Sequence, residues 1–260
     1  MIRYLILFVL FFTNLMPHSA KAGETKLYKD GDVTLEGYLA MPDPDKFKGE
    51  RPAILIAHQW KGLGEYEKRR ADMLADLGFI AFAVDVYGQG IRPKTTQEAL
   101  TEATKYKSDP DLARRRMSAA LDYVQTLPFV DKGKIAAIGY CFGGTMVLEL
   151  ARSGAKINGV VSFHGNLATT KPAQKGDVKA PILIHHGAVD PVVTQYEVEN
   201  FKKEMGEAQA DWHMIVYADA VHAFTEKEAG DDPSDGAAYN EKADKRSWAY
   251  TLQFFDEIFS

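Results

Sequence analysis

Residues 134–144 read KIAAIGYCFGG, and this stretch decides the fold. The apolar run at 134–138 has the character of a strand, and residues 145–152 have the character of a helix. Glycines two residues before and two residues after Cys141 allow the backbone to turn sharply between the two elements. The stretch predicts a strand, a tight turn and a helix, with the Cys141 side chain projecting at the head of the helix.

Cys141 is the only cysteine among the 260 residues. The N-terminus of a helix stabilises negative charge, so this position favours the thiolate, which is the nucleophilic form. Two interpretations stay open from this stretch alone: Cys141 is a catalytic nucleophile, or it is a small buried hydrophobic residue. Because a single cysteine cannot form an internal disulfide, the fold must depend on its apolar core.

The rest of the chain alternates between short apolar runs and helical patterns. A turn at 30–32 separates two alternating segments, 26–29 and 33–41, and predicts an antiparallel hairpin at the start of the fold. Apolar runs typical of strands buried on both faces follow at 53–57, 79–84, 134–138, 158–163, 181–185 and 214–217. Helical patterns lie at 66–77, 96–107, 111–127, 145–152, 193–205 and 236–258.

This alternation predicts the fold class. Strands that alternate with helices form a mostly parallel sheet with helices on both faces, here preceded by the N-terminal antiparallel hairpin. Gly78 and Gly206 are expected to end two of the helices. Because no repeat or linker interrupts the pattern, we expect a single α/β domain over residues 23–260.

Residues 1–22 have the features of a secretion signal. Arg3 precedes an apolar stretch at 4–12 that is too short to span a bilayer, and Ala20-Lys21-Ala22 offers small residues at alternate positions. We expect cleavage after Ala22 and export to the periplasm or the medium. The alternative is an uncleaved N-terminal anchor. No later segment of the sequence is apolar enough to cross a membrane.

The charge balance argues against a nucleic-acid partner. The chain has 31 Lys and Arg against 36 Asp and Glu, and removal of residues 1–22 takes away Arg3 and Lys21 but no acid. The mature chain therefore carries a net charge of about −7, which would repel phosphate backbones. The basic cluster at 114–116 lies in a helical pattern and fits a solvated face. We expect a monomer that acts on a small molecule, with no membrane contact after cleavage.

Two later residues could complete a catalytic unit with Cys141. Asp190 and His222 each follow a predicted strand, so the chain order is nucleophile, acid, histidine, as in α/β-hydrolases. In such a unit His222 takes the thiol proton and returns it to the leaving group, while Asp190 orients the ring. Taken singly, Asp190 could be a turn residue and His222 an ordinary loop histidine.

The same geometry predicts an oxyanion hole. One donor is the backbone N–H of Phe142, directly after the nucleophile. The second is expected in the loop after the strand at 53–57, around Gln59 and Trp60.

A metal or cofactor site is not indicated. His58, His164, His185 and His186 lie near strand ends, but no pair has the spacing of a familiar zinc motif. The adjacent His185 and His186 would point to opposite faces of a strand. The glycines at 62, 64, 88 and 90 do not follow dinucleotide or phosphate-loop spacing. We expect no metal and no cofactor.

Several motifs together resemble the dienelactone hydrolase family of α/β-hydrolases. They are GYCFGG at 139–144, HGAVDP at 186–191 and VHAF at 221–224, and the similarity extends over nearly all of residues 23–260. The cysteine in the turn is specific, since most α/β-hydrolases place serine there. The resemblance implies a Cys-His-Asp triad that hydrolyses an ester or lactone through an acyl-thiol intermediate, without a cofactor.

The sequence also departs from that family. Gln59 stands where the dienelactone enzymes have a glutamate that helps to activate the cysteine, and a neutral amide cannot act as that base. Their two arginines, which hold the substrate carboxylate, correspond to Gln89, with Arg92 close by, and to Glu226 and Lys227. An incomplete carboxylate clamp predicts a substrate other than dienelactone itself.

Aromatic residues near the strand ends would suit an uncharged or weakly polar acyl group, although each could instead cap the core. The candidate substrate contacts are Gln59, Tyr87, Arg92, Tyr140 and Phe224. The leading hypothesis is an exported hydrolase of esters, lactones or thioesters. The alternative, favoured by Gln59 and the missing arginines, is a non-catalytic ligand-binding protein on the same scaffold. Redox sensing through Cys141 would need an external partner, because no resolving cysteine is present.

Overall fold

The computed structural model describes residues 23–260, so the predicted signal segment lies outside the described residues. The strands are β1 (Glu24–Asp30), β2 (Val33–Ala40), β3 (Arg51–Ala57), β4 (Ile80–Val84), β5 (Val130–Tyr140), β6 (Gly159–Phe163), β7 (Ile182–Gly187) and β8 (Trp212–Tyr217). The helices are α1 (Glu65–Asp76), α2 (Thr96–Ser108), α3 (Pro110–Gln125), α4 (Phe142–Arg152), α5 (Gln195–Ala208) and α6 (Glu241–Phe259), with short 3₁₀ turns η1 (Lys227–Ala229) and η2 (Pro233–Asp235).

All eight strands form one sheet in the order β1-β2-β4-β3-β5-β6-β7-β8. β1 and β2 pair antiparallel, and β2 also runs antiparallel to β4. Every other neighbouring pair in this sheet is parallel. The predicted hairpin and mostly parallel sheet are confirmed. Because the parallel strands point the same way, their carboxyl ends meet along one edge of the sheet.

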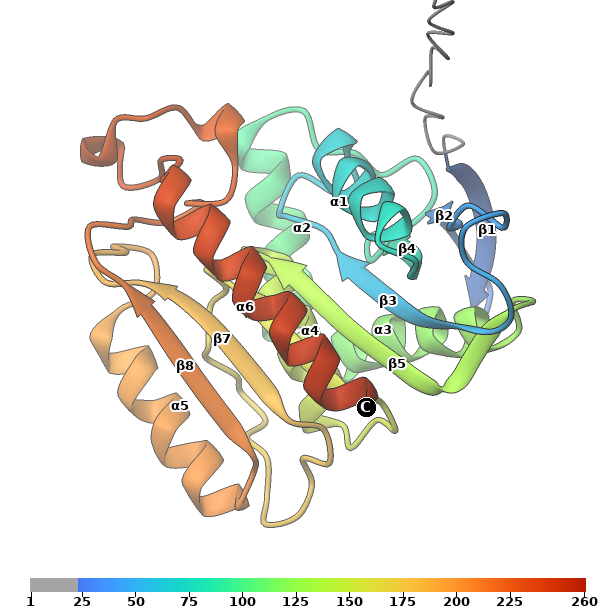
Figure 1. Cartoon of the computed structure of the whole chain (residues 1–260). Coiled ribbons are helices and arrows are strands. Elements are labelled where there is room, and N and C mark those ends of the chain that lie inside the picture. The colour runs from blue at the N-terminus through green and yellow to red at the C-terminus, as the bar shows by residue number, and fades with distance from the viewer. Residues whose placement is uncertain (1–22) are drawn as a thin grey trace, which may run out of the picture.

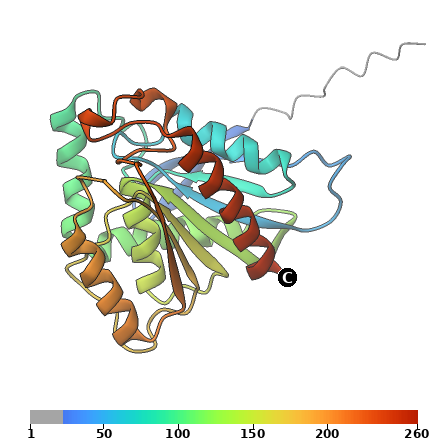
Figure 2. The same ribbon diagram turned by 60° about the vertical axis from the view of Figure 1, so that its left-hand side comes forward.

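Helices cover both faces of the sheet, as Figures 1 and 2 show from two directions. Side chains of α1 and α6 pack on one face, and those of α2 to α5 pack on the other. Side chains of β3 pack into the core on both faces of the sheet: Leu55 lies in one core, and Ile54 and Ile56 lie in the other. Burial of each such side chain contributes roughly 1.5–3 kcal/mol to folding, which explains the nearly continuous apolar runs.

Several helix ends differ from the sequence prediction, and two of the differences have a clear cause. α6 begins at Glu241 rather than at Gly236, because Gly236 has a positive φ of 77° and the Asn240 side chain accepts a hydrogen bond from the Ala243 N–H as the N-cap. Gly206 does not end α5, which continues to Ala208 and closes with Gln209 in the left-handed region. The prediction for Gly78 is confirmed, since it follows α1 with a φ of 94°.

Between residues 23 and 260, no helix combines the length and the apolar character needed to cross a bilayer.

Candidate active site

The turn between β5 and α4 is as tight as the sequence predicts. Cys141 is its single residue and adopts a φ of 53° and a ψ of −115°, a strained backbone for a side chain other than glycine. A Cβ on Gly139 would lie 2.0 Å from the Gly143 carbonyl oxygen, and one on Gly143 would lie 2.1 Å from the Ala57 carbonyl oxygen. Only glycine fits at either position, so the two glycines make the tight turn possible. This turn carries Cys141, which is partly exposed.

Cys141, His222 and Asp190 form one hydrogen-bonded chain. The Nε2 atom of His222 lies 3.1 Å from the Cys141 Sγ atom, and its Nδ1 atom lies 2.9 Å from Asp190 Oδ2. The other carboxylate oxygen of Asp190 accepts the N–H groups of Val192 and Val193 at 2.8 and 3.1 Å. The three side chains come from the loops after β5, β7 and β8, and the structure brings them together as the sequence predicts.

The charge of His222 is set by its partners. Burial alone would lower its pKa, but the negative charge of Cys141 and the hydrogen bonds to Asp190 and Cys141 outweigh that effect and raise the pKa to about 10. The imidazole therefore holds a proton beside the sulfur at neutral pH, which is the arrangement a thiolate nucleophile requires.

The other buried histidines stay neutral. His164 packs edge to face against the His222 ring at 5.2 Å and contacts the Thr225 hydroxyl through Nε2, and burial lowers its pKa well below the ordinary value. His185 contacts the hydroxyls of Thr251 and Tyr217, and burial lowers its pKa to about 3. Among residues 23–260, no three His, Cys, Asp or Glu side chains gather as metal ligands.

The loop after β3 lies against the N-terminus of α4. Its Gln59 N–H donates to the Glu67 carboxylate at 3.1 Å, and its Trp60 carbonyl accepts the Tyr87 hydroxyl at 2.8 Å. Within the described part of the chain, neither the Phe142 N–H nor the Trp60 N–H donates to a protein acceptor. Both N–H groups are predicted from the sequence to be oxyanion donors, and both are therefore free to bind a substrate oxygen.

The predicted substrate contacts fall into two groups. Arg92 is paired with the carboxylates of Asp85 and Glu36 at 3.5 and 3.7 Å, so its charge is already compensated. The Gln59 side chain lies near Glu226, whose pKa burial raises and Gln59 partly lowers. Both residues border the Trp60 loop, and their contact with a substrate stays a prediction.

The aromatic candidates are buried. Tyr87, Tyr140 and Phe224 expose 1% of their surface or less. Tyr140 stacks on Phe163, and Phe224 packs on Tyr217, so both form part of the core in this state. A direct substrate contact for these residues also stays a prediction.

Two residues around the site were not expected from the sequence. Glu67 is buried in α1, where its carboxylate accepts the N–H groups of Gln59 and Gly64, and burial raises its pKa. His58, considered only as a metal ligand, holds the same loop. The spacing of Gly64 and Glu67 is that of a capping pair at a helix start, which is the one signal that could have identified Glu67.

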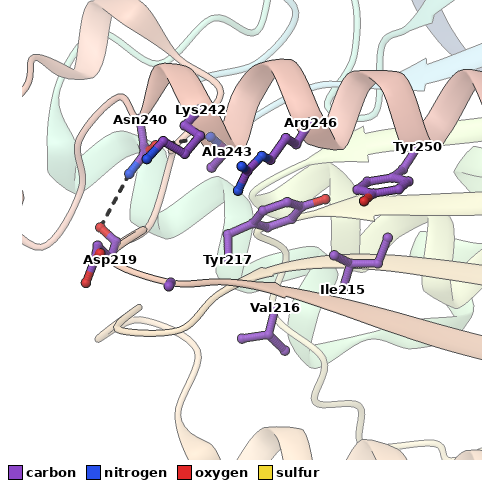
Figure 3. Close-up of a pocket in the computed structure, with 10 residues that line it drawn as sticks. Ile215, Val216, Tyr217, Asp219, Asn240, Lys242, Ala243, Arg246 and Tyr250 are labelled. Carbon is purple, nitrogen blue, oxygen red and sulfur yellow. Dashed lines mark hydrogen bonds between the residues drawn. The ribbon is translucent and has the colours of Figure 1, made fainter.

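Two cavities are lined by residues of the loops that carry the site. One of about 240 Å³ adjoins the Trp60 loop, between α1 and η1, and is lined by Gln59, Tyr66, Glu67, Arg69 and Glu226 among others. Another of about 510 Å³ opens between β8 and α6, where the Arg246 side chain points toward Tyr217 (Figure 3). Cys141 lines neither cavity, and only the first borders a residue of the predicted oxyanion hole.

The mostly parallel sheet and the sharp strand-to-helix turn that carries Cys141 define an α/β-hydrolase. Within this class, the chain belongs to the dienelactone hydrolase family, whose model matches residues 35–259. The family membership makes the protein a hydrolase and supports ester or lactone hydrolysis.

Solved structures agree with this placement, and a relative of unassigned function is similar in sequence. The dienelactone hydrolase-like promiscuous phosphotriesterase P91 from metagenomic libraries is 35% identical, with a TM-score of 0.83 over 91% of this chain and 98% of that one. A structure named m3DLH is 33% identical, with a TM-score of 0.86 over 92% and 98% of the two chains. An uncharacterized protein of Caenorhabditis elegans is 37% identical over 148 residues, which cover 56% of this chain and 93% of that protein.

Proposed function

We propose that the protein hydrolyses a carboxylic ester, lactone or thioester by nucleophilic attack of Cys141, with His222 as general acid and base and Asp190 as the residue that orients it. The observation that carries the proposal is the hydrogen-bonded chain from the sulfur through both nitrogens of His222 to the Asp190 carboxylate. The raised pKa of His222 supports it, because a protonated imidazole can stabilise a thiolate.

In the first half of the reaction the thiolate attacks the carbonyl carbon. The carbon–sulfur bond forms, and the electron pair of the C=O bond moves to the oxygen, which the N–H groups of Phe142 and Trp60 stabilise. The tetrahedral intermediate then expels the alcohol oxygen, which takes the proton from His222. An acyl thioester on Cys141 and a neutral imidazole remain.

In the second half water replaces the alcohol. His222 takes a proton from the water as its oxygen attacks the acyl carbon, and the carbon–sulfur bond breaks to release the acid. The thiolate and the imidazolium are thereby restored. Asp190 keeps Nδ1 of the ring protonated, so that Nε2 is always the nitrogen that exchanges a proton with the reacting atoms.

The substrate is proposed to lack a carboxylate next to the scissile group. Arg92 is already paired with two carboxylates, and Glu226 and Lys227 stand where the dienelactone enzymes have their second arginine. An anionic substrate would therefore meet no free bidentate guanidinium at either position. A neutral acyl group is the better fit.

A second candidate reaction is phosphotriester hydrolysis. It is favoured by the 35% identity to P91, which is described as a promiscuous phosphotriesterase. The thiolate would attack phosphorus instead of carbon, and the same N–H groups would stabilise the phosphoryl oxygen. The bond from phosphorus to the leaving oxygen would break as that oxygen takes the proton from His222, and water, deprotonated by His222, would then cleave the phosphorus–sulfur bond.

The test is a substrate panel of p-nitrophenyl esters from acetate to hexanoate, five- and six-membered lactones, and one p-nitrophenyl phosphotriester. We expect turnover of at least one ester or lactone, and a loss of kcat/KM of at least about 1000-fold in Cys141→Ala and after treatment with iodoacetamide. Unchanged rates in either case would contradict the nucleophile. Stoichiometric binding without turnover, surviving in Cys141→Ala, would instead support the ligand-binding alternative.

We also propose that residues 1–22 direct export and that the mature protein is a monomer without a cofactor. N-terminal sequencing of protein recovered from the periplasm or medium should begin at Gly23, and light scattering should give the mass of one chain. Retention of Met1 in the recovered protein, or a dimer mass, would contradict the respective part.

A further inference from the structure

The peptide between Gln59 and Trp60 is held at all but one of its flanking polar atoms. The Gln59 N–H donates to Glu67, and the Gln59 carbonyl lies 2.6 Å from His58 Nδ1. The Trp60 carbonyl accepts the Tyr87 hydroxyl. The polar atom left without a protein acceptor, among residues 23–260, is the Trp60 N–H.

The tautomer of His58 follows from its neighbours. The Val86 N–H donates to His58 Nε2 at 3.2 Å, so Nε2 is the acceptor and Nδ1 carries the proton that it donates to the Gln59 carbonyl. Burial lowers the pKa of His58, so the ring stays neutral and keeps this arrangement at neutral pH. In a trans peptide the C=O and N–H point in opposite directions, so fixing the Gln59 carbonyl also fixes the direction of the Trp60 N–H.

His58 and Tyr87, the two side chains that hold this peptide, also contact α4, the helix that carries the first oxyanion donor. The His58 ring lies 5.7 Å from the Phe142 ring at 24° and 4.6 Å from the Tyr87 ring. A Cβ on Gly143 would strike the Ala57 and His58 carbonyl oxygens, so the loop and the N-terminus of α4 are in close contact. The Tyr87 ring also packs on the Phe142 ring at 5.3 Å, so both side chains that hold the loop contact the first residue of α4.

We propose that His58 and Tyr87 are positioning residues, which hold the peptide between Gln59 and Trp60 so that its N–H points at the oxygen of a carbonyl under attack by Cys141. The proposal rests on the proposed hydrolase function. It assigns His58 a role through the loop backbone rather than through a metal or a proton transfer, and it assigns Tyr87 a role other than direct substrate contact.

The experiment compares two reactions of the same sulfur. Acylation by a p-nitrophenyl ester forms an oxyanion, whereas alkylation by iodoacetamide is a displacement at carbon and forms none. In Tyr87→Phe and in His58→Leu we expect kcat and kcat/KM for the ester to fall together by about 10- to 100-fold, with the alkylation rate within twofold of wild type at every pH. His58→Asn, whose amide nitrogen can replace the Nδ1 donor, should recover part of the loss.

Matched controls separate positioning from general destabilisation. Tyr28→Phe removes a buried hydroxyl that also donates to a backbone carbonyl, that of Asp85, and His185→Asn alters a neutral buried histidine on β7. Both should lower the thermal midpoint while leaving ester turnover within twofold of wild type. Tyr87→Phe keeps the test valid if His58→Leu fails to fold.

Three results would overturn the inference. The first is an unchanged ester rate in Tyr87→Phe and in a folded His58→Leu. The second is a rise in KM with kcat preserved, which would make Tyr87 a substrate contact. The third is an alkylation rate that falls as far as the ester rate. Failure of the proposed function is distinguishable, because the wild-type protein would then turn over no ester or lactone of the panel.

Discussion

His222 differs from the other buried histidines in its partners, not in its burial. His164 and His185 are as deeply buried, and burial lowers their pKa values because no negative charge from the described residues offsets it beside either ring. His222 has the Cys141 sulfur at one nitrogen and the Asp190 carboxylate at the other, and these partners raise its pKa. At the scale of single residues, the proposed chemistry is therefore a matter of which groups face each ring.

The pH dependence of acylation should report this pairing. His222 must be protonated to hold the thiolate and to supply the leaving-group proton, so kcat/KM should fall as the pH rises through about 10. Asp190→Asn removes the carboxylate that favours the imidazolium, so the falling limb should move to lower pH and the rate should drop by about 100-fold or more. A limb that stays in place, or moves to higher pH, would count against Asp190 as the partner of His222.

At the scale of elements, the site depends on how closely β3, β5 and α4 approach one another. The Gly143 position touches the backbone that follows β3, and the Gly139 position touches the first turn of α4. Any side chain at either place would push the helix away from the loop that carries Trp60. The turn at Cys141 and the loop that carries Trp60 are therefore packed directly against each other, and a change in one displaces the other.

Gly143→Ala should destabilise this unit by roughly 1–3 kcal/mol, because the added methyl overlaps the Ala57 carbonyl. Gly206→Ala is the matched control: it lies inside α5 with no atom within 4 Å of the added methyl, so it should stabilise the protein by about 1 kcal/mol. Urea unfolding of the two variants measures both effects. If Gly143→Ala left both the free energy of unfolding and the ester turnover unchanged, the close approach of Gly143 to the Ala57 carbonyl would not be needed.

At the scale of the whole molecule, much of the fold and of the site could be predicted from sequence. Buried parallel strands have continuous apolar runs, and residues that directly follow such strands must meet at one edge, so Cys141, Asp190 and His222 could be placed together. The pairing of Arg92 with Asp85 and Glu36 could not, since nothing in a sequence states which of many carboxylates a guanidinium meets. The burial of Tyr140 and Phe224 could not be predicted either, because an aromatic residue at a strand end can face either the solvent or the core.

Acid should destabilise the folded chain through its neutral histidines. His185 has a folded pKa of about 3 and an unfolded value near 6.5, so between those values the unfolded chain binds the extra proton and stability falls as the pH falls. Urea unfolding near pH 5 should therefore give a slope of free energy against pH that is steeper in wild type than in His185→Asn by about 1.4 kcal/mol per pH unit. Equal slopes would mean that His185 is protonated in the folded state.

The most direct test of the central claim is the mass of the protein during turnover. The wild-type protein is mixed with a slowly hydrolysed p-nitrophenyl ester, quenched in acid within the first turnover and digested for mass spectrometry. We predict that the peptide containing Cys141 gains the mass of one acyl group and loses it as product appears, and that Cys141→Ala gains none. Steady release of p-nitrophenol and of the free acid with Cys141 unmodified throughout, or with the acyl group on another residue, would contradict the account.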